Sequence, residues 1–398
     1  MAIVTFAPDF SCMNSSAKAF TEHWGSSPSV VASAPGRVEI TSNHTEYNGD
    51  TVVGAAISRR LEVACSLRTD GVIQIASDSV VETSVETYQE PSLPDWTRYP
   101  LGVFDELRML EIIKANIGFD LTVVSEIPPG EGLASSAAFE LATAIALDAL
   151  CRSQARGSER SALVRIAHRA ENRFVGVPCG LLDQSVAGFA RAGSLVVLDA
   201  STGRHHLQAL PENSSLVLFR THIRLQLIDS PYEKRYDECR QALMGLQKVI
   251  PGIRYLAHLH PVDIVAYDVI LSETLARRAR HVVEEQRRVG GFLRALTESD
   301  TSAAGGLLFD SHESSKTQFE NSTPEMDFLV QKLKEHPGVL GARLSGAGWG
   351  PAVLAMVDSS FKDESADHVA TNYEEVFEAS SPWQRTEFSD GARIEWQS

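Results

Sequence analysis

A glycine-rich segment at residues 130–138 has the composition of a phosphate-binding loop. Gly130 and Gly132 stand between a predicted strand and a predicted helix, and small residues follow from Ala134 to Ala138. Free backbone N–H groups and the positive end of a helix dipole at such a junction favour an anion. The segment lacks the Lys of the G-x-x-x-x-G-K-[ST] loop and does not follow G-x-G-x-x-G. A tight turn followed by a closely packed helix explains the same residues, so both interpretations stay open.

A second group of polar side chains directly precedes an apolar segment. Residues 43–49 read Asn-His-Thr-Glu-Tyr-Asn-Gly, and they lie between Arg37 and the apolar run 52–57. Dense hydrogen-bonding groups beside a core segment suggest a ligand site. A capped loop with His44 as a satisfied structural histidine is the alternative.

Asp183 places one carboxylate inside the otherwise apolar stretch Cys179–Gln184. A buried carboxylate needs a partner, and Arg37 is the natural candidate. A helix cap or a structural ion pair is the alternative role for an isolated aspartate of this kind.

The hydrophobic pattern predicts the elements that position these residues. Alternation from Phe119 to Ile127 predicts a strand that ends at the glycine-rich segment. Good helix formers, apolar on nearly every side, predict a buried helix from Ser135 to about Cys151. Asp70-Gly71 predicts a hairpin turn between two early strands. Further patterns predict helices at 101–113, 161–174 and 271–296, strands at 61–67, 72–76, 194–199, 215–220 and 352–357, and a turn at 345–348.

The composition excludes some classes of partner. The 398 residues include 36 Lys and Arg against 52 Asp and Glu, a net charge of −16, which disfavours general binding to nucleic acid or anionic membranes. No apolar run approaches the roughly 18–20 residues that span a bilayer. The most basic segment is interleaved with acidic residues and is predicted to be a solvated helix face. It contains Arg277, Arg278, Arg280, Arg287 and Arg288, with Glu284 and Glu285 between them.

The cysteines and the N-terminal residues favour a cytoplasmic protein. Residues 1–13 have no Lys or Arg ahead of an apolar stretch, unlike a secretory signal. The cysteines are scattered, odd in number and without a C-x-x-C pair, which favours reduced thiols and predicts no structural metal. They are Cys12, Cys65, Cys151, Cys179 and Cys239.

In combination and in this order, the segments resemble the galactokinases of the GHMP kinase superfamily. The resemblance runs over residues 34–350, most of the chain, and Ala170-Glu171-Asn172 also matches the family. The motifs, each with the family pattern first, are A-P-G-R-V-N at Ala34–Glu39, G-E-H-T-D-Y-N at Ser42–Asn48, P-x-G-x-G-L-S-S-S-A at Pro128–Ala137, C-G-I-M-D-Q at Cys179–Gln184, Y-x-x-R-x-x-x-C at Tyr232–Cys239, R-A-R-H-V-x-x-E-x-x-R at Arg278–Arg288 and G-A-R-x-[ST]-G-x-G-[FW]-G at Gly341–Gly350. Chance agreement of so many ordered motifs is remote.

The resemblance implies a role for each matching residue. Asp183 would accept or orient the proton of an anomeric hydroxyl as it attacks the γ-phosphorus of ATP, and Arg37 would stabilise charge on the transferring group. Ser136 and Glu171 match positions that hold Mg²⁺, a cation that takes oxygen ligands. Glu131 stands where the family has a small residue, so its carboxylate would have to point away from ATP. The implied nucleotide-binding residues are Gly130, Gly132, Leu133, Ala134, Ser135, Ser136, Gly346 and Gly348.

Most departures from the family pattern lie in the implied sugar pocket. Asn43 stands where the family has Glu, Glu46 where it has Asp, and Ser42 where it has Gly. Asn43 exchanges an acceptor-only group for a mixed donor and acceptor, and Glu46 extends a carboxylate by one methylene. A lost charged hydrogen bond costs about 1.5–3 kcal/mol, so these substitutions bear on which sugar is bound. The implied sugar-binding residues are Asn43, His44, Glu46, Gly180 and Tyr232.

The resemblance implies an α+β protein with the two-domain GHMP kinase fold, residues 1–200 and 201–398, and an active site in the cleft between the domains. The implied activity is phosphorylation of a sugar at its anomeric hydroxyl, with ATP and the sugar as partners and D-galactose as the first candidate. One alternative keeps the chemistry but uses a related uronic acid, amino sugar or pentose, since neutral Asn43 would tolerate a C6 carboxylate better than Glu. A non-catalytic sugar sensor is the other alternative, and the retention of Arg37, Asp183 and Ser136 argues against it. The oligomeric state stays open.

Overall fold

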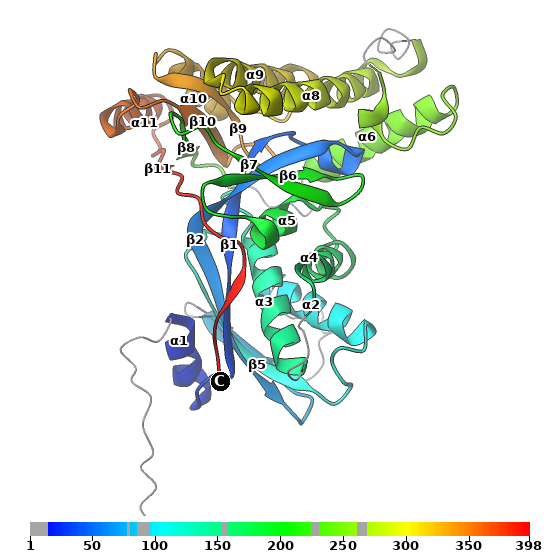
Figure 1. Cartoon of the computed structure of the whole chain (residues 1–398), viewed down its shortest axis with the longest axis vertical. Helices are drawn as coiled ribbons and strands as arrows, with labels where there is room; N and C mark the ends of the chain where they lie inside the picture. The colour runs from blue at the N-terminus through cyan, green and yellow to red at the C-terminus, as the bar shows by residue number, and fades with distance from the viewer. Residues whose placement is uncertain (1–14, 78–79, 86–94, 153–157, 225–230, 261–268) are drawn as a thin grey trace, which may run out of the picture.

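The computed structural model describes residues 15–77, 80–85, 95–152, 158–224, 231–260 and 269–398. Cys12 and the N-terminal residues 1–13 lie outside these ranges. Two sheets organise the described chain, and helices pack on both (Figure 1). The helices α8 (Glu273–Thr297) and α9 (Thr301–Ser314) lie at the end of the molecule opposite α1 (Ser15–Trp24).

In the described ranges the first sheet has eight strands. Six follow the order β12-β1-β2-β5-β3-β4, β6 pairs with part of β2, and β7 pairs with β6. Residue 37 of β1 lies opposite Ala56, and residue 39 lies opposite Gly54. The strands are β1 (Val30–Thr41), β2 (Thr51–Arg68), β3 (Ile73–Ser77), β4 (Val80–Val85), β5 (Gly118–Ser125), β6 (Ser194–Asp199), β7 (Arg204–Ala209) and β12 (Arg393–Gln397).

The second sheet has four strands in the order β11-β8-β10-β9. Its strands are β8 (Ser215–Arg220), β9 (Val339–Leu344), β10 (Ala352–Val357) and β11 (Trp383–Arg385). The division of the chain at residue 200 stays a prediction. The first sheet includes 204–209 and 393–397, so residues from beyond position 200 pair in the same sheet as β1 and β6.

The remaining helices cover the two sheets. In order they are α2 (Arg98–Met109), α3 (Ser135–Cys151), α4 (Arg160–Arg169), α5 (Leu182–Phe189), α6 (Pro231–Gln247), α10 (Pro324–Lys334) and α11 (Asp363–Phe377), with short 3₁₀ turns at Glu46–Asn48, Asp95–Thr97 and Leu256–His258 and π-helical turns at Ala170–Val175 and Ser315–Phe319. The predicted helix at 161–174 is therefore α4 followed by a π-turn. No helix in the described ranges is long and apolar enough to cross a bilayer.

The predicted hairpin at Asp70-Gly71 is wrong, although both of its strands exist. β5 lies between β2 and β3, pairing antiparallel with β2 and parallel with β3. The carboxylate of Asp70 accepts from the Val72 amide and from Arg68, so the turn is local. A turn motif reports only local chain reversal, whereas a distant strand can pair between the two arms.

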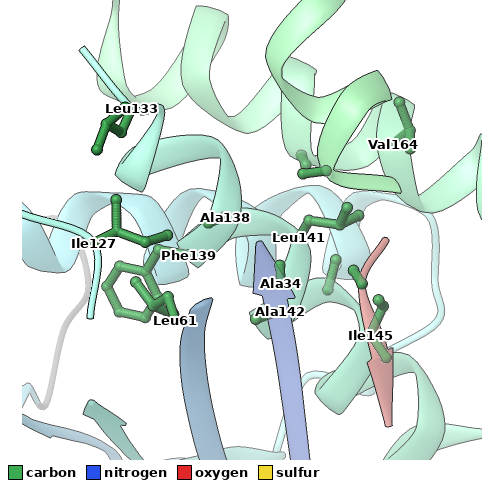
Figure 2. Close-up of a cluster of buried hydrophobic side chains, with 14 of the residues drawn as sticks. Ala34, Leu61, Ile127, Leu133, Ala138, Phe139, Leu141, Ala142, Ile145 and Val164 are labelled. Atoms are coloured by element: carbon green, nitrogen blue, oxygen red, sulfur yellow. The ribbon is translucent and has the colours of Figure 1, made fainter. Parts of the chain in front are cut away.

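The helix α3 packs on every side, as its composition predicts. Its side chains pack with alternate residues of β1 and β2, such as Ala34 and Leu61, whereas α1 covers Val31 and Ala64 on the opposite face. Figure 2 shows Phe139 and Ala142 of α3 beside these two strands. This packing fixes the start of α3, and with it the glycine-rich loop.

The prediction of a solvated face on α8 is wrong for Arg278 and Glu285. Arg278 is only 2% exposed, and its Nε and Nη2 donate to Glu238 and Glu320 at 2.7 and 2.6 Å. Glu285 is fully buried and pairs with Arg288, whereas Arg287 is exposed. Since α8 contacts both α6 and α9, buried ion pairs replace solvent along two of its sides. A pattern of alternating charges looks the same in either case.

Candidate active site

A bidentate ion pair between Arg37 and Asp183 lies at the centre of the candidate site. Arg37 comes from β1, and Asp183 from the first turn of α5. The guanidinium donates from Nε to Oδ1 at 2.6 Å and from Nη2 to Oδ2 at 2.7 Å. Arg37 is 7% exposed, and its remaining Nη1 donates to the Gly132 carbonyl at 2.6 Å. One side chain therefore holds both the carboxylate and the glycine-rich loop.

The glycine-rich loop leaves the start of α3 open. Gly132 has a φ of +73°, which favours glycine, and the backbone N–H of Arg37 donates to the Leu133 carbonyl at 3.0 Å. Ala134 precedes α3 in the left-handed conformation, and no side chain caps the helix there. The first N–H groups of Ser135 and Ser136 thus have the arrangement that binds phosphate at helix N-termini.

Glu131 of this loop points toward the second sheet. Its carboxylate accepts a hydrogen bond from Nη1 of Arg220, the last residue of β8. Arg220 and Glu131 are 16% and 20% exposed, so the pair is largely shielded from solvent. The positive guanidinium balances a negative charge that would otherwise stand in the phosphate loop.

Glu46 and Gly180 are brought together beside the ion pair. The Glu46 carboxylate accepts from the Gly180 amide at 3.2 Å, and a Cβ on residue 180 would lie 2.3 Å from the Glu46 carboxyl carbon. Burial, with the charges of Asp183 and Glu39, raises the pKa of Glu46 to about 8. Tyr232 of α6 is buried, and burial followed by the charge of Glu46 raises the pKa of its hydroxyl.

Asn43 and His44 instead bond to protein groups of the loop at 346–348. The Asn43 amide donates to the Gly346 carbonyl and accepts from the Asn321 amide. The His44 Nε2 donates to the Ala347 carbonyl at 2.7 Å, which leaves Nδ1 to accept from the Tyr47 hydroxyl at 2.8 Å. Their side-chain atoms do not join the Arg37 and Asp183 group; they tie the polar segment to the last glycine-rich loop.

The ring of His44 is part of an aromatic cluster. Its centroid lies 4.9 Å from Tyr232, 4.7 Å from Phe319 and 5.4 Å from Trp349. Burial lowers the pKa of His44 to about 3, so the imidazole is neutral at physiological pH. Tyr232, whose hydroxyl pKa is raised in part by the charge of Glu46, places this aromatic cluster near Glu46.

Ser136 and Glu171 lie together, as a shared metal site requires. Glu171 comes from the π-turn after α4, accepts from the Ser136 hydroxyl, and accepts from Nε2 of Gln184 at 2.6 Å. Burial raises the pKa of Glu171, and burial together with the charge of Glu171 raises the pKa of Glu140 well above its usual range. Two adjacent oxygen donors fit Mg²⁺ that also binds phosphate oxygens. No cluster of three His, Cys, Asp or Glu suited to a metal occurs in the described ranges.

Sequence reasoning missed four residues of this site. Gln184 bridges Glu171 and Glu140, and Asn321 holds both Asn43 and the carbonyl of Ala347. Nothing in the sequence connects Asn321 with a segment nearly 280 residues earlier. No sequence pattern pointed to Arg220 either. Glu39 could have been found from the sequence, because it follows Arg37 by two residues on the same predicted strand and so shares its face.

Three family models match the chain. They are the GHMP kinases N terminal domain over residues 98–191, the galactokinase galactose-binding signature over 18–67, and the GHMP kinases C terminal model over 292–379. A mevalonate kinase from Methanococcus jannaschii shares the fold, with a TM-score of 0.61 and 15% identity over 92% of this chain and 100% of that chain. The chain is thus a GHMP kinase by fold and domain content, as its motifs indicate.

Proteins with higher sequence identity to this chain show which family of GHMP kinases it resembles. The crystal structure of Lactococcus lactis galactokinase complexed with galactose has a TM-score of 0.88 and 29% identity, over 95% of this chain and 98% of that chain. A galactokinase of Roseiflexus sp. is 35% identical over 359 residues, 90% of each chain. The human galactokinase is 30% identical over 388 residues, 95% of each chain. The chain belongs to the galactokinase family, which confirms the resemblance of its motifs.

Proposed function

We propose that this protein transfers the γ-phosphoryl group of ATP to the anomeric hydroxyl of D-galactose. The observation that carries the proposal is the bidentate pair of Arg37 and Asp183, fixed against the phosphate loop through Gly132. Membership of the galactokinase family supports the choice of both substrates.

In this proposal the residues act mainly by position. Two charge-assisted hydrogen bonds fix the Asp183 carboxylate, which orients the anomeric hydroxyl and takes up its proton as the hydroxyl oxygen attacks the γ-phosphorus. The bond to the bridging oxygen of ADP breaks as the new bond forms, and Arg37 stabilises the negative charge of the transferring group. Glu46 and the Gly180 backbone hold the sugar beside Asp183.

The phosphate loop and the metal site complete the proposed machinery. We assign phosphate binding to the backbone of Gly130–Ser136 and the facing glycines 346 and 348. Ser136 and Glu171 would hold Mg²⁺, which supplies neutralisation of the phosphate charge when bound. Use of ATP also favours a cytoplasmic location.

The test is release of ADP from Mg-ATP by the purified protein, offered D-galactose, galactosamine, galacturonic acid and a C6-deoxy analogue. The proposal predicts the highest kcat/KM with D-galactose, and ³¹P NMR should place the new phosphate on C1. Turnover restricted to one analogue would contradict galactose as the substrate. Sugar and ATP binding without any turnover would favour a sensor.

A further inference from the structure

Glu39 lies on the same face of the first sheet as Arg37. No register shift interrupts β1 between the two residues, so their side chains project in the same direction. Its cross-strand neighbour is Gly54, where an added Cβ would lie 2.7 Å from Val186 and 3.5 Å from Leu182. This face is therefore the one covered by α5, whose first turn carries Asp183.

The carboxylate of Glu39 has no hydrogen-bond partner among the described residues, although the residue as a whole is only 6% exposed. The backbone N–H of Glu39 donates to the Ser345 hydroxyl oxygen, and its backbone carbonyl accepts from the same hydroxyl. No hydrogen bond or ion pair within 4 Å reaches the carboxylate from the parts of the chain that the structure describes. Burial raises its pKa to about 7, against the more distant attraction of Arg343 and Arg37.

The neighbourhood of Glu39 is the candidate sugar pocket. Its charge helps to raise the pKa of both Glu46 and Tyr232, so the three groups share one region. A carboxylate that is largely shielded and has no donor from the protein is free to accept a hydrogen bond from a ligand, and a sugar hydroxyl is a donor of the right kind.

Relative to the family pattern, this chain exchanges the residue types at positions 39 and 43. The pattern has Asn at residue 39 and Glu at residue 43, whereas this chain has Glu39 and Asn43. Asn43 is already bonded to Gly346 and Asn321. The exchange therefore removes a carboxylate from the polar segment and adds one to the strand beside Arg37.

We propose that Glu39 is a sugar-binding residue that sets specificity, accepting a hydrogen bond from a hydroxyl or an ammonium group of the substrate and disfavouring anionic sugars. The inference rests on the proposed sugar kinase function. It selects among the related sugars. Glu39, with a pKa of about 7, carries negative charge at and above neutral pH, so a neutral or amino sugar fits beside it and the carboxylate of a uronic acid does not.

The test compares the wild type with Glu39→Gln and Glu39→Asn, the second being the residue type of the family pattern. Calorimetry measures binding of D-galactose, galactosamine and galacturonic acid, and kinetics measure KM and kcat. We expect both variants to bind galactose or galactosamine roughly tenfold to a hundredfold more weakly, with KM for ATP unchanged. Discrimination against galacturonic acid should fall by a similar factor. Glu298→Gln, which removes an exposed carboxylate at the end of α8, should change neither the sugar affinity nor the discrimination against galacturonic acid.

Other outcomes are distinguishable. Unchanged affinity for every sugar, with only a lower melting temperature, would mean that Glu39 merely balances Arg343, and would overturn the proposal. Failure of the folded wild type to bind any of these sugars would overturn it too. Sugar binding without turnover would contradict the kinase function alone, since the binding comparison still tests Glu39.

Discussion

Single residues determine how closely the pieces of the active site approach one another. The backbone of Gly180 lies against the Glu46 side chain and donates to its carboxylate, so residue 180 has no room for a Cβ. One extra methyl group there would push the carboxylate out of place while leaving the ion pair of Arg37 and Asp183 intact.

We therefore expect Gly180→Ala to weaken sugar binding. Loss of this hydrogen bond and displacement of the Glu46 side chain should raise KM for the sugar roughly tenfold, with KM for ATP little changed. Steady-state kinetics with each substrate varied in turn measure both values. Gly290→Ala is the control, because an added Cβ there meets nothing within 4 Å. Equal kinetics for both variants would contradict this reading of Gly180.

A buried aspartate outside the ion pair makes stability depend on pH. Asp50 accepts from the Thr51 amide at 2.6 Å, its other oxygen has no partner among the described residues, and burial raises its pKa from 3.8 to about 8. The folded protein therefore holds a proton that the unfolded chain loses near its lower pKa, so stability falls as pH rises from about 4 to about 8. The slope is at most about 1.4 kcal/mol per pH unit.

Asp50→Asn should flatten this dependence. Urea unfolding between pH 5 and 9 measures it, and the variant should lose less free energy of unfolding over that range than the wild type. Glu39 and Glu46 act in the same direction, so some slope should remain. Parallel curves for the two proteins would show that Asp50 is not protonated in the folded state.

Among the elements, the glycine-rich loop of residues 130–138 is held from two sides. Arg37 of the first sheet bonds to Gly132, and Arg220 of the second sheet bonds to the neighbouring Glu131. The second contact joins two substantially buried charges, and in the proposed function this pairing would remove a repulsion of the phosphates of ATP.

Removing Arg220 alone should therefore impair ATP binding. We expect Arg220→Gln to raise KM for ATP roughly tenfold, since an unbalanced carboxylate close to phosphate costs on the order of 1–2 kcal/mol. Glu131→Ser should have a small effect, and the double variant should recover wild-type KM. If the double variant is as impaired as Arg220→Gln, Arg220 acts in some other way than by balancing Glu131.

At the scale of the whole molecule, one buried carboxylate connects the first sheet to the helical layer. Glu285 of α8 accepts from the Thr41 hydroxyl at 3.2 Å, the Ser42 amide at 3.1 Å and the Ser311 hydroxyl at 2.5 Å. It also pairs with Arg288 at 2.6 Å. These bonds fix the position of the C-terminal end of β1, which leads directly into the polar segment at residues 43–49.

Glu285→Gln should be strongly destabilising. Breaking a buried ion pair by changing one partner costs about 3–5 kcal/mol, because the other charge stays buried. Denaturant unfolding measures the loss. Glu284→Gln is a matched control one residue away, with a side chain 40% exposed, and should change stability by less than about 1 kcal/mol. Similar losses in the two variants would contradict a central role for Glu285.

Local sequence signals predicted much of this architecture. The helix Ser135–Cys151 and the strands Ser194–Asp199, Ser215–Arg220 and Ala352–Val357 lie where their hydrophobic patterns place them, because burial on one or all sides leaves a regular spacing. Arg37 and Asp183 also meet, although the Asp183 side chain is 25% exposed and so is not the buried carboxylate that the sequence predicted. Features set by distant pairing were missed, including the position of β5 between β2 and β3 and the bonds of Asn43 to Asn321 and Gly346.

Phosphoryl transfer to D-galactose by Asp183→Asn, measured beside the wild type together with calorimetric binding of ATP and galactose, tests the proposed kinase activity most directly. The wild type should form galactose 1-phosphate. The variant should lose roughly 100-fold or more of kcat while it still binds ATP. Undiminished turnover in the variant, or none in a wild type that binds both substrates, would show that Asp183 does not act in this way.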